Sequence, residues 1–207
     1  MKMKGIDIKG LINQVKNLLM KPKDALAEAR DVRPAMKDLI VYLAIVAVPT
    51  LIGILVGYGL VGYGTFRVYA RMPIGWAVGW ALFQYIFSII GIIIFAYVVN
   101  ALAPSFSSKK DQIQATKLAV YTATPWLVAG ILFIFPPISF LVLLAGLYGV
   151  YIMYLGLPVL METPENRKIA YLVVSLIVFI VVMWVVGQVS TAVMQSAMGV
   201  GYHFAFY

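Results

Sequence analysis

The chain has 207 residues, of which 63% are apolar and only 12% charged, and its formal net charge is +8. So little polar surface cannot cover a soluble globule, which excludes an ordinary soluble domain. The sequence contains no cysteine, which excludes disulfides and thiolate metal sites. The first 38 residues hold no continuous apolar core of signal-peptide length, so we expect them to remain in the mature protein.

The N-terminal segment, residues 1–38, shows helical amphipathicity. Apolar residues recur at helical spacing, with polar residues on the opposite face: Ile8, Leu11, Ile12, Val15, Leu18 and Leu19 against Lys9, Asn13, Lys16 and Asn17. This pattern predicts an interfacial helix, used either as a lipid-facing anchor or as a docking surface for a cytoplasmic protein partner. Pro22 interrupts the pattern, and Asp24 is expected to cap a second short helix over residues 25–30.

Five apolar stretches without any charged residue follow, at 39–62, 76–103, 118–135, 138–161 and 169–187. Since about 20 apolar residues cross a bilayer as a helix, each stretch is close to or beyond the length of a span. The sequence therefore predicts an all-α polytopic membrane protein, with a five-helix transmembrane domain over residues 39–195 and a short external tail over 196–207.

The basic residues are distributed unequally between the two sides of these spans. Of the 16 lysines and arginines, 14 lie in the N-terminal segment and in the second and fourth loops. The positive-inside rule then predicts a cytoplasmic N-terminus and an external C-terminus, in the cytoplasmic membrane of a prokaryote. Because the charge lies beside spans, the lipid bilayer is the expected partner and nucleic acid is not.

A tandem repeat, Leu-Val-Gly-Tyr-Gly, occupies residues 55–64 and matches the end of a potassium-channel filter sequence. It closes the first span rather than following a pore helix, so we interpret it as a helix end permitted by glycine. Small residues four apart, Gly53 with Gly57 and Gly75 with Gly79, favour close helix packing. That packing is either within the chain or across a homo-oligomer.

Polar side chains near the inner halves of spans two, three and four form a possible seam: Asn100, Tyr121, Thr122, Thr124, Tyr148, Tyr151 and Tyr154. Interhelical hydrogen bonds are one interpretation, and a small cavity for a lipid headgroup, ion or solute is the other. The spans contain no nucleophile–base–acid set and no acidic pair, and His203 stands alone. We therefore predict no enzyme activity, no catalytic or metal site and no cofactor.

The run over residues 119–126, the pair at 136–137 and the runs 145–151 and 154–158 resemble the Yip family, as does the acidic segment 162–165. The residues that carry this likeness are Pro125, Pro136, Pro137, Gly146, Gly149, Gly156 and Pro158. Members are five-span membrane proteins named for interaction with Ypt/Rab GTPases. The resemblance implies five spans, a cytoplasmic N-terminus and, in eukaryotic members, a role in vesicle trafficking.

This chain lacks the long cytosolic N-terminal domain and the Asp-Leu-Tyr-Gly-Pro motif of the eukaryotic members, which places it closer to the prokaryotic branch. The predicted function is non-enzymatic, in membrane organisation or as a partner scaffold. A small channel or transporter that uses the polar seam is the alternative.

Overall fold

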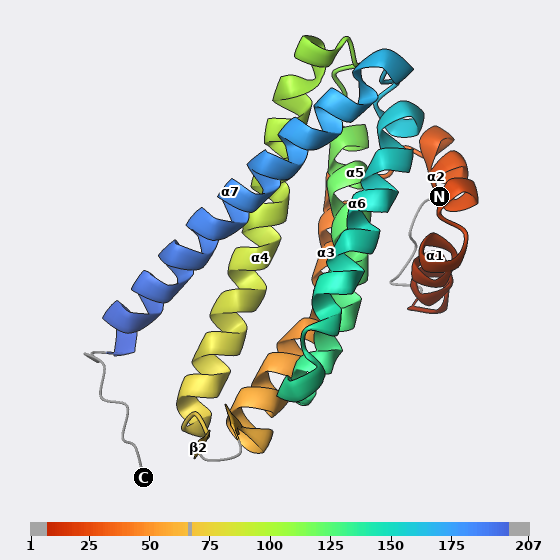
Figure 1. Ribbon diagram of the computed structural model, residues 1–207. Helices are drawn as coiled ribbons and strands as arrows, with labels where there is room; N and C mark the ends of the chain where they lie inside the picture. The colour runs from red at the N-terminus through yellow and green to blue at the C-terminus, as the bar shows by residue number, and fades with distance from the viewer. Residues whose placement is uncertain (1–7, 66–67, 199–207) are drawn as a thin grey trace.

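The computed structural model describes residues 8–65 and 68–198, which form a bundle of long helices with two short helices against one side (Figure 1). The short helices are α1 (Ile8–Met20) and α2 (Pro22–Asp31), and the long ones are α3 (Met36–Val56), α4 (Ile74–Leu102), α5 (Gln112–Ala129), α6 (Leu141–Leu160) and α7 (Glu165–Met198). Within the described residues, five helices are long and apolar enough to cross a membrane. The predicted all-α membrane fold is confirmed.

The first span ends at the repeat of residues 55–64. Helix α3 continues as a π-helical segment, η1 (Gly57–Val61), and stops at Gly62, whose φ of 92° is readily adopted only by glycine. A small antiparallel hairpin follows, β1 (Tyr63–Thr65) paired with β2 (Val68–Ala70). The repeat is therefore a helix end, as the sequence indicates.

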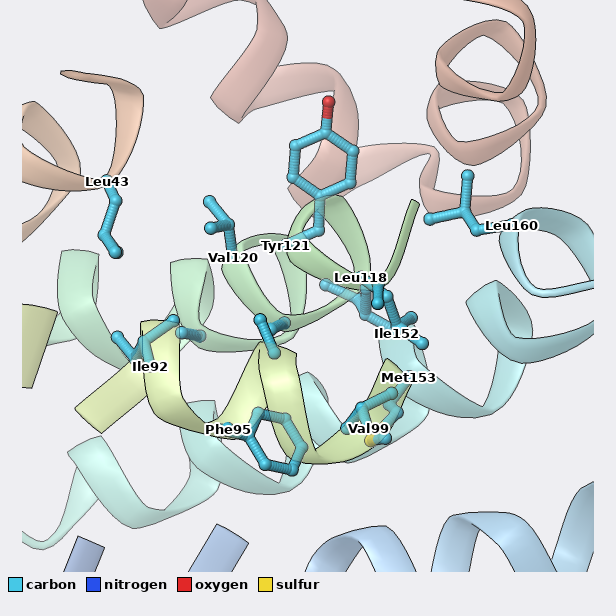
Figure 2. Close-up of a cluster of buried hydrophobic side chains, with 14 of the residues drawn as sticks. Leu43, Ile92, Phe95, Val99, Leu118, Val120, Tyr121, Ile152, Met153 and Leu160 are labelled. Atoms are coloured by element: carbon cyan, nitrogen blue, oxygen red, sulfur yellow. The ribbon is translucent and has the colours of Figure 1, made fainter. Parts of the chain in front are cut away.

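Helix α5 lies at the centre of the bundle and packs against α3, α4 and α6. It continues into a 3-10 segment, η3 (Gly130–Ile134), and a proline turn, η4 (Pro136–Ile138), reverses the chain into α6. Figure 2 shows the resulting core, where Phe95 of α4, Leu118 of α5 and Met153 of α6 meet, each nearly fully buried. Helix α4 continues into η2 (Ala103–Phe106), and α7 packs mainly against α4 and leans away from α6 (Figure 1).

Two glycine pairs show how closely these elements approach. A Cβ added at Gly149 of α6 would collide with the Thr122 carbonyl of α5, and one at Gly53 of α3 with the Gly130 carbonyl of η3. Backbones this close require a residue without a side chain. The packing of the Gly53–Gly57 pair is thus within the chain, whereas a Cβ at Gly75 would meet no atom within 4 Å.

The start of α2 corrects one expectation. Helix α2 begins at Pro22, whose ring fixes a φ suited to the first helical position. Lys21 occupies the N-cap position without a side-chain capping bond, and Asp24 lies within the first turn. The expected cap by Asp24 on a helix over 25–30 is therefore wrong, because the proline itself starts the helix.

Candidate functional site

The two N-terminal helices pack on the outer side of α5 and α6 (Figure 1). Leu18 of α1 is 1% exposed and Leu26 of α2 is fully buried, while Leu11 and Val15 pack against the same core. The polar side of α1, including Lys16, remains exposed. Part of the apolar face of α1 thus contacts the chain's own bundle, while Ile12 and Met20 stay exposed at 58% and 69%. Its use toward lipid or toward a cytoplasmic protein partner stays a prediction.

Tyrosines of the bundle hold α1 in place. The Tyr148 hydroxyl of α6 donates a 2.8 Å hydrogen bond to the Leu19 carbonyl, in the last turn of α1. The Tyr121 hydroxyl of α5 accepts a 2.8 Å hydrogen bond from Gln14 Nε2, and Figure 2 shows this hydroxyl pointing away from the apolar cluster. Carbonyls in the last turn of a helix lack intrahelical partners, so Tyr148 supplies a partner that α1 needs.

Polar side chains of α5 perform the same task for α2. Lys117 Nζ donates to the carbonyls of Ala29 and Val32, and Gln114 Nε2 donates to the Arg30 carbonyl at 2.9 Å. Lys117 is 1% exposed, so its ammonium group is held by these carbonyls inside the protein. The partial negative charge at the C-terminus of α2 stabilises the cation. We call these contacts of α1 and α2 with α5 and α6 the hairpin dock.

A hollow of about 290 Å³ lies beside the dock, at the end of the bundle where α5 begins and α6 ends. Its lining combines three basic and three acidic side chains with one amide and one apolar wall: Arg30, Arg33, Lys109, Asp31, Asp111, Glu162, Gln114 and Leu160. We call it the charged hollow.

Ion pairs across the charged hollow join three segments of the chain. Arg33 lies 2.8 Å from Asp111, which also caps α5 by accepting from two backbone N–H groups of its first turn. Lys109 lies 2.9 Å from Glu162, just after α6. The hydrogen bond from Lys109 holds the pKa of the Glu162 carboxyl below its ordinary value, and the positive charges of Lys109 and Arg30 add to this effect.

The structure divides the proposed seam into separate groups. Tyr42 and Thr124 hydroxyls lie 3.3 Å apart beside Tyr121, whose ring centroid is 5.9 Å from that of Tyr42. Asn100 instead donates to Gln112 Oε1 at 2.8 Å, at the end of the bundle.

The remaining seam residues make no hydrogen bond to either group. The Lys168 ammonium sits 3.8 Å from the Tyr154 ring centroid, a cation–π contact. Tyr151 is 43% exposed, and the buried Thr122 hydroxyl has no hydrogen-bond partner. The arrangement differs from a single seam because Tyr121 and Tyr148 face α1, a contact that sequence periodicity does not reveal.

The residues that carry the family likeness are structural. The four prolines lie within α5, within α6 or in η4: Pro125, Pro158, Pro136 and Pro137. Gly149 faces the Thr122 carbonyl, and a Cβ at Gly156 would collide with the Leu118 side chain. A Cβ at Gly146 would meet no atom within 4 Å, so this glycine makes no such approach.

Three residues of the dock, Gln14, Gln114 and Lys117, were missed as site residues by sequence reasoning. The apolar run begins at Leu118, so the sequence alone places Lys117 in the loop before it. The sequence does offer one signal. Lys117 stands between Thr116 and Leu118, directly before the apolar run, so a helix that starts ahead of this run would include the lysine.

The residues that the structure describes offer no set of metal ligands. No group of three or more His, Asp or Glu side chains there could hold a metal ion. His203 lies outside the described residues.

The family model of the Yip1 domain matches residues 16–186, from the middle of α1 to the middle of α7. No curated protein and no solved structure matches the chain. The match includes residues 16–20 of α1, all of α2 and the first two thirds of α7. The charged hollow therefore lies within it, and so does the hairpin dock apart from its contacts through Leu11, Gln14 and Val15. Because the model covers most of the sequence, the chain belongs to the Yip1 domain family.

Proposed function

We propose that this chain is a non-enzymatic scaffold of a prokaryotic cytoplasmic membrane, which presents the docked α1–α2 hairpin to a protein partner on the cytoplasmic side. The observation that carries the proposal is the use of polar side chains in the spans. Tyr148, Gln114 and Lys117 donate hydrogen bonds to backbone carbonyls of the helical hairpin that α1 and α2 form. Such groups fix the position of a surface rather than perform chemistry.

The outer face of α1 gives this surface its character. Lys9, Asn13 and Lys16 are exposed there, together with Ile12 at 58% exposure. A basic face with a few apolar side chains suits an acidic protein surface near the membrane. Its fixed position on α5 and α6 reduces the ordering cost of binding.

Cytoplasmic orientation is supported by the 14 of 16 basic residues on one side of the spans. Because the sequence has no cysteine, a single introduced cysteine shows on which side of the membrane its position lies. Gly75→Cys, at the start of α4, and Ser105→Cys, in η2 just after its end, should react with a membrane-impermeant maleimide from opposite sides of the membrane. Labelling of both variants from outside intact cells would contradict the orientation.

The scaffold role is tested with a photo-crosslinking residue at position 16 in cells. A discrete protein adduct is expected, and it should disappear when Lys117→Met removes the two hydrogen bonds from Lys117 to the end of α2. The same probe at the exposed position 177 of α7 serves as the control for lipid contact. Adducts with lipid alone at position 16 would overturn the scaffold role.

We do not extend the proposal to transport. Two of the polar residues expected to line a path belong to separate hydrogen-bonded groups: Thr124 is paired with Tyr42, and Asn100 is paired with Gln112. Ion and dye flux through proteoliposomes should equal that of empty liposomes, and a specific flux would favour the channel or transporter instead.

A further inference from the structure

The charged hollow contains acceptors that the protein itself leaves without a partner. Gln114 is 6% exposed, and its Oε1 atom is buried without a hydrogen bond while Nε2 is used by the Arg30 carbonyl. Asp31 also lines the hollow and forms no ion pair with another residue of 8–65 or 68–198. A buried unpaired acceptor costs about 1–3 kcal/mol, so Gln114 Oε1 calls for an external donor. Asp31 is exposed and adds a carboxylate that no ion pair of the described residues uses.

One donor in the charged hollow is also incompletely used. The closest carboxylate to the Arg30 guanidinium is Glu162 at 3.9 Å, which is too far for a hydrogen bond. Glu162 is already engaged by Lys109 at 2.9 Å. The Arg30 side chain, 55% exposed, therefore has donors that no hydrogen bond of the described residues uses, within the same lining as the free acceptors.

The balance of charges limits the class of ligand. Three acidic side chains oppose a simple anion, and three basic side chains oppose a simple cation. A zwitterion that carries a primary ammonium and a phosphate satisfies both sets of free groups. The volume of about 290 Å³ admits a group of headgroup size and is below that of most drug-sized ligand sites.

The position of the hollow agrees with this chemistry. It lies where α5 begins and α6 ends, and α5 and α6 are both apolar enough to span the membrane. The ends of spans lie in the headgroup layer of a bilayer. We infer that the charged hollow binds a phosphoethanolamine group, with its ammonium on Gln114 Oε1 and Asp31 and its phosphate on Arg30. This inference is independent of the scaffold role.

The first test compares headgroups on the purified full chain. Thermal shifts are titrated with dihexanoyl phosphatidylethanolamine, the matching phosphatidylcholine and phosphatidylglycerol, and free phosphoethanolamine. Choline has no N–H donor and glycerol has no ammonium, so both lipids should bind at least about tenfold more weakly than the ethanolamine lipid. Equal affinity for all three lipids would overturn the inference.

Free phosphoethanolamine distinguishes the two sources of the same group. Tighter binding of the lipid identifies the membrane as the source, and equal binding identifies the soluble compound; either supports the site. No saturable binding of the lipid or of the free compound overturns it.

Variants then assign the site. Asp31→Asn and Arg30→Gln should each weaken the ethanolamine lipid by about tenfold. Both side chains are outside the core and donate or accept no hydrogen bond that holds the dock, so folding is retained. Glu28→Gln is the matched control, an exposed acid on α2 outside the hollow. Unchanged affinity in the first two variants, or an equal loss in the control, would contradict the assignment.

Discussion

Helices α5 and α7 are both long enough to cross the membrane, yet they are built in opposite ways. Helix α7 has the highest hydropathy of the five spans and α5 has the lowest. Even so, 61% of the most apolar stretch of α5 is buried within the protein, against 11% for α7. In water the most apolar helix would be the core, but lipid is as apolar as leucine and gives no reason to hide it.

The comparison explains which side chains specify the bundle. Around α5, the fit depends on glycines facing backbone and on hydroxyl, amide and ammonium groups that find partners. Around α7, exposed side chains such as Ile177, at 56% exposure, face lipid whether or not the bundle is folded. Substitutions on the two helices should therefore differ in cost even when they are chemically identical.

The largest difference should come from truncating apolar side chains. Leu118→Ala opens a cavity in the centre of α5, where Leu118 is fully buried, and should cost about 2–5 kcal/mol. Ile177→Ala on α7 should cost less than about 0.5 kcal/mol, since lipid fills the space. Unfolding of the purified protein in mild detergent measures both. Equal losses would show that α7 is packed against protein.

A smaller but sharper difference is expected for glycine-to-alanine substitutions. The new Cβ in Gly149→Ala collides with the Thr122 carbonyl and should cost about 1–3 kcal/mol through overpacking. In Gly187→Ala on α7, it meets no atom within 4 Å. That variant should gain up to about 1 kcal/mol from helix propensity. Opposite signs of the change in melting temperature test the pair, and a loss in both variants would contradict the contrast.

The first two predictions show what sequence could and could not supply. Span number and type follow from the apolar runs, because length and lack of charge are properties of the chain itself. Which span is central does not follow from the sequence, since the same apolar side chain can face either lipid or protein. The Gly149 contact lies within a motif that the sequence singled out, but nothing in the sequence states that Gly146, three residues earlier, faces open space.

The same limit applies to the candidate site. An amphipathic pattern predicts α1, but its apolar face suits a bilayer and the side of a helical bundle equally well. Tyr148 is identified as a polar residue in a span, while its partner, the Leu19 carbonyl, lies 129 residues away. From the sequence, Lys117 is a charged residue of a loop. Only the fold shows that it donates to carbonyls at the C-terminus of α2.

The hairpin dock gives the third prediction, which is local rather than global. Tyr148→Phe leaves the ring in place but removes the hydroxyl that donates to the Leu19 carbonyl, and should cost about 1 kcal/mol. Hydrogen exchange should accelerate in residues 8–20 and remain unchanged in α7. Tyr151→Phe is the matched control, because this tyrosine is 43% exposed. Identical exchange in the two variants would remove Tyr148 from the dock.

The smallest effect should come from the ion pair that ties the start of α7 to the start of α5. Lys109 lowers the pKa of Glu162 in the folded protein. A carboxyl whose pKa is lower when folded stabilises the protein above its unfolded pKa, and this contribution disappears as pH falls through the lowered value. The stability difference between the native chain and Glu162→Gln should therefore be present at neutral pH and shrink as the solution is acidified. Because Glu162 lies at the surface, added salt should also reduce that difference. Melting temperatures of both proteins over a pH series provide the measurement, with Glu28→Gln as a surface control. A difference that persists unchanged at acidic pH would mean that Glu162 acts through the backbone, where its φ of 52° is unusual, and not through its charge.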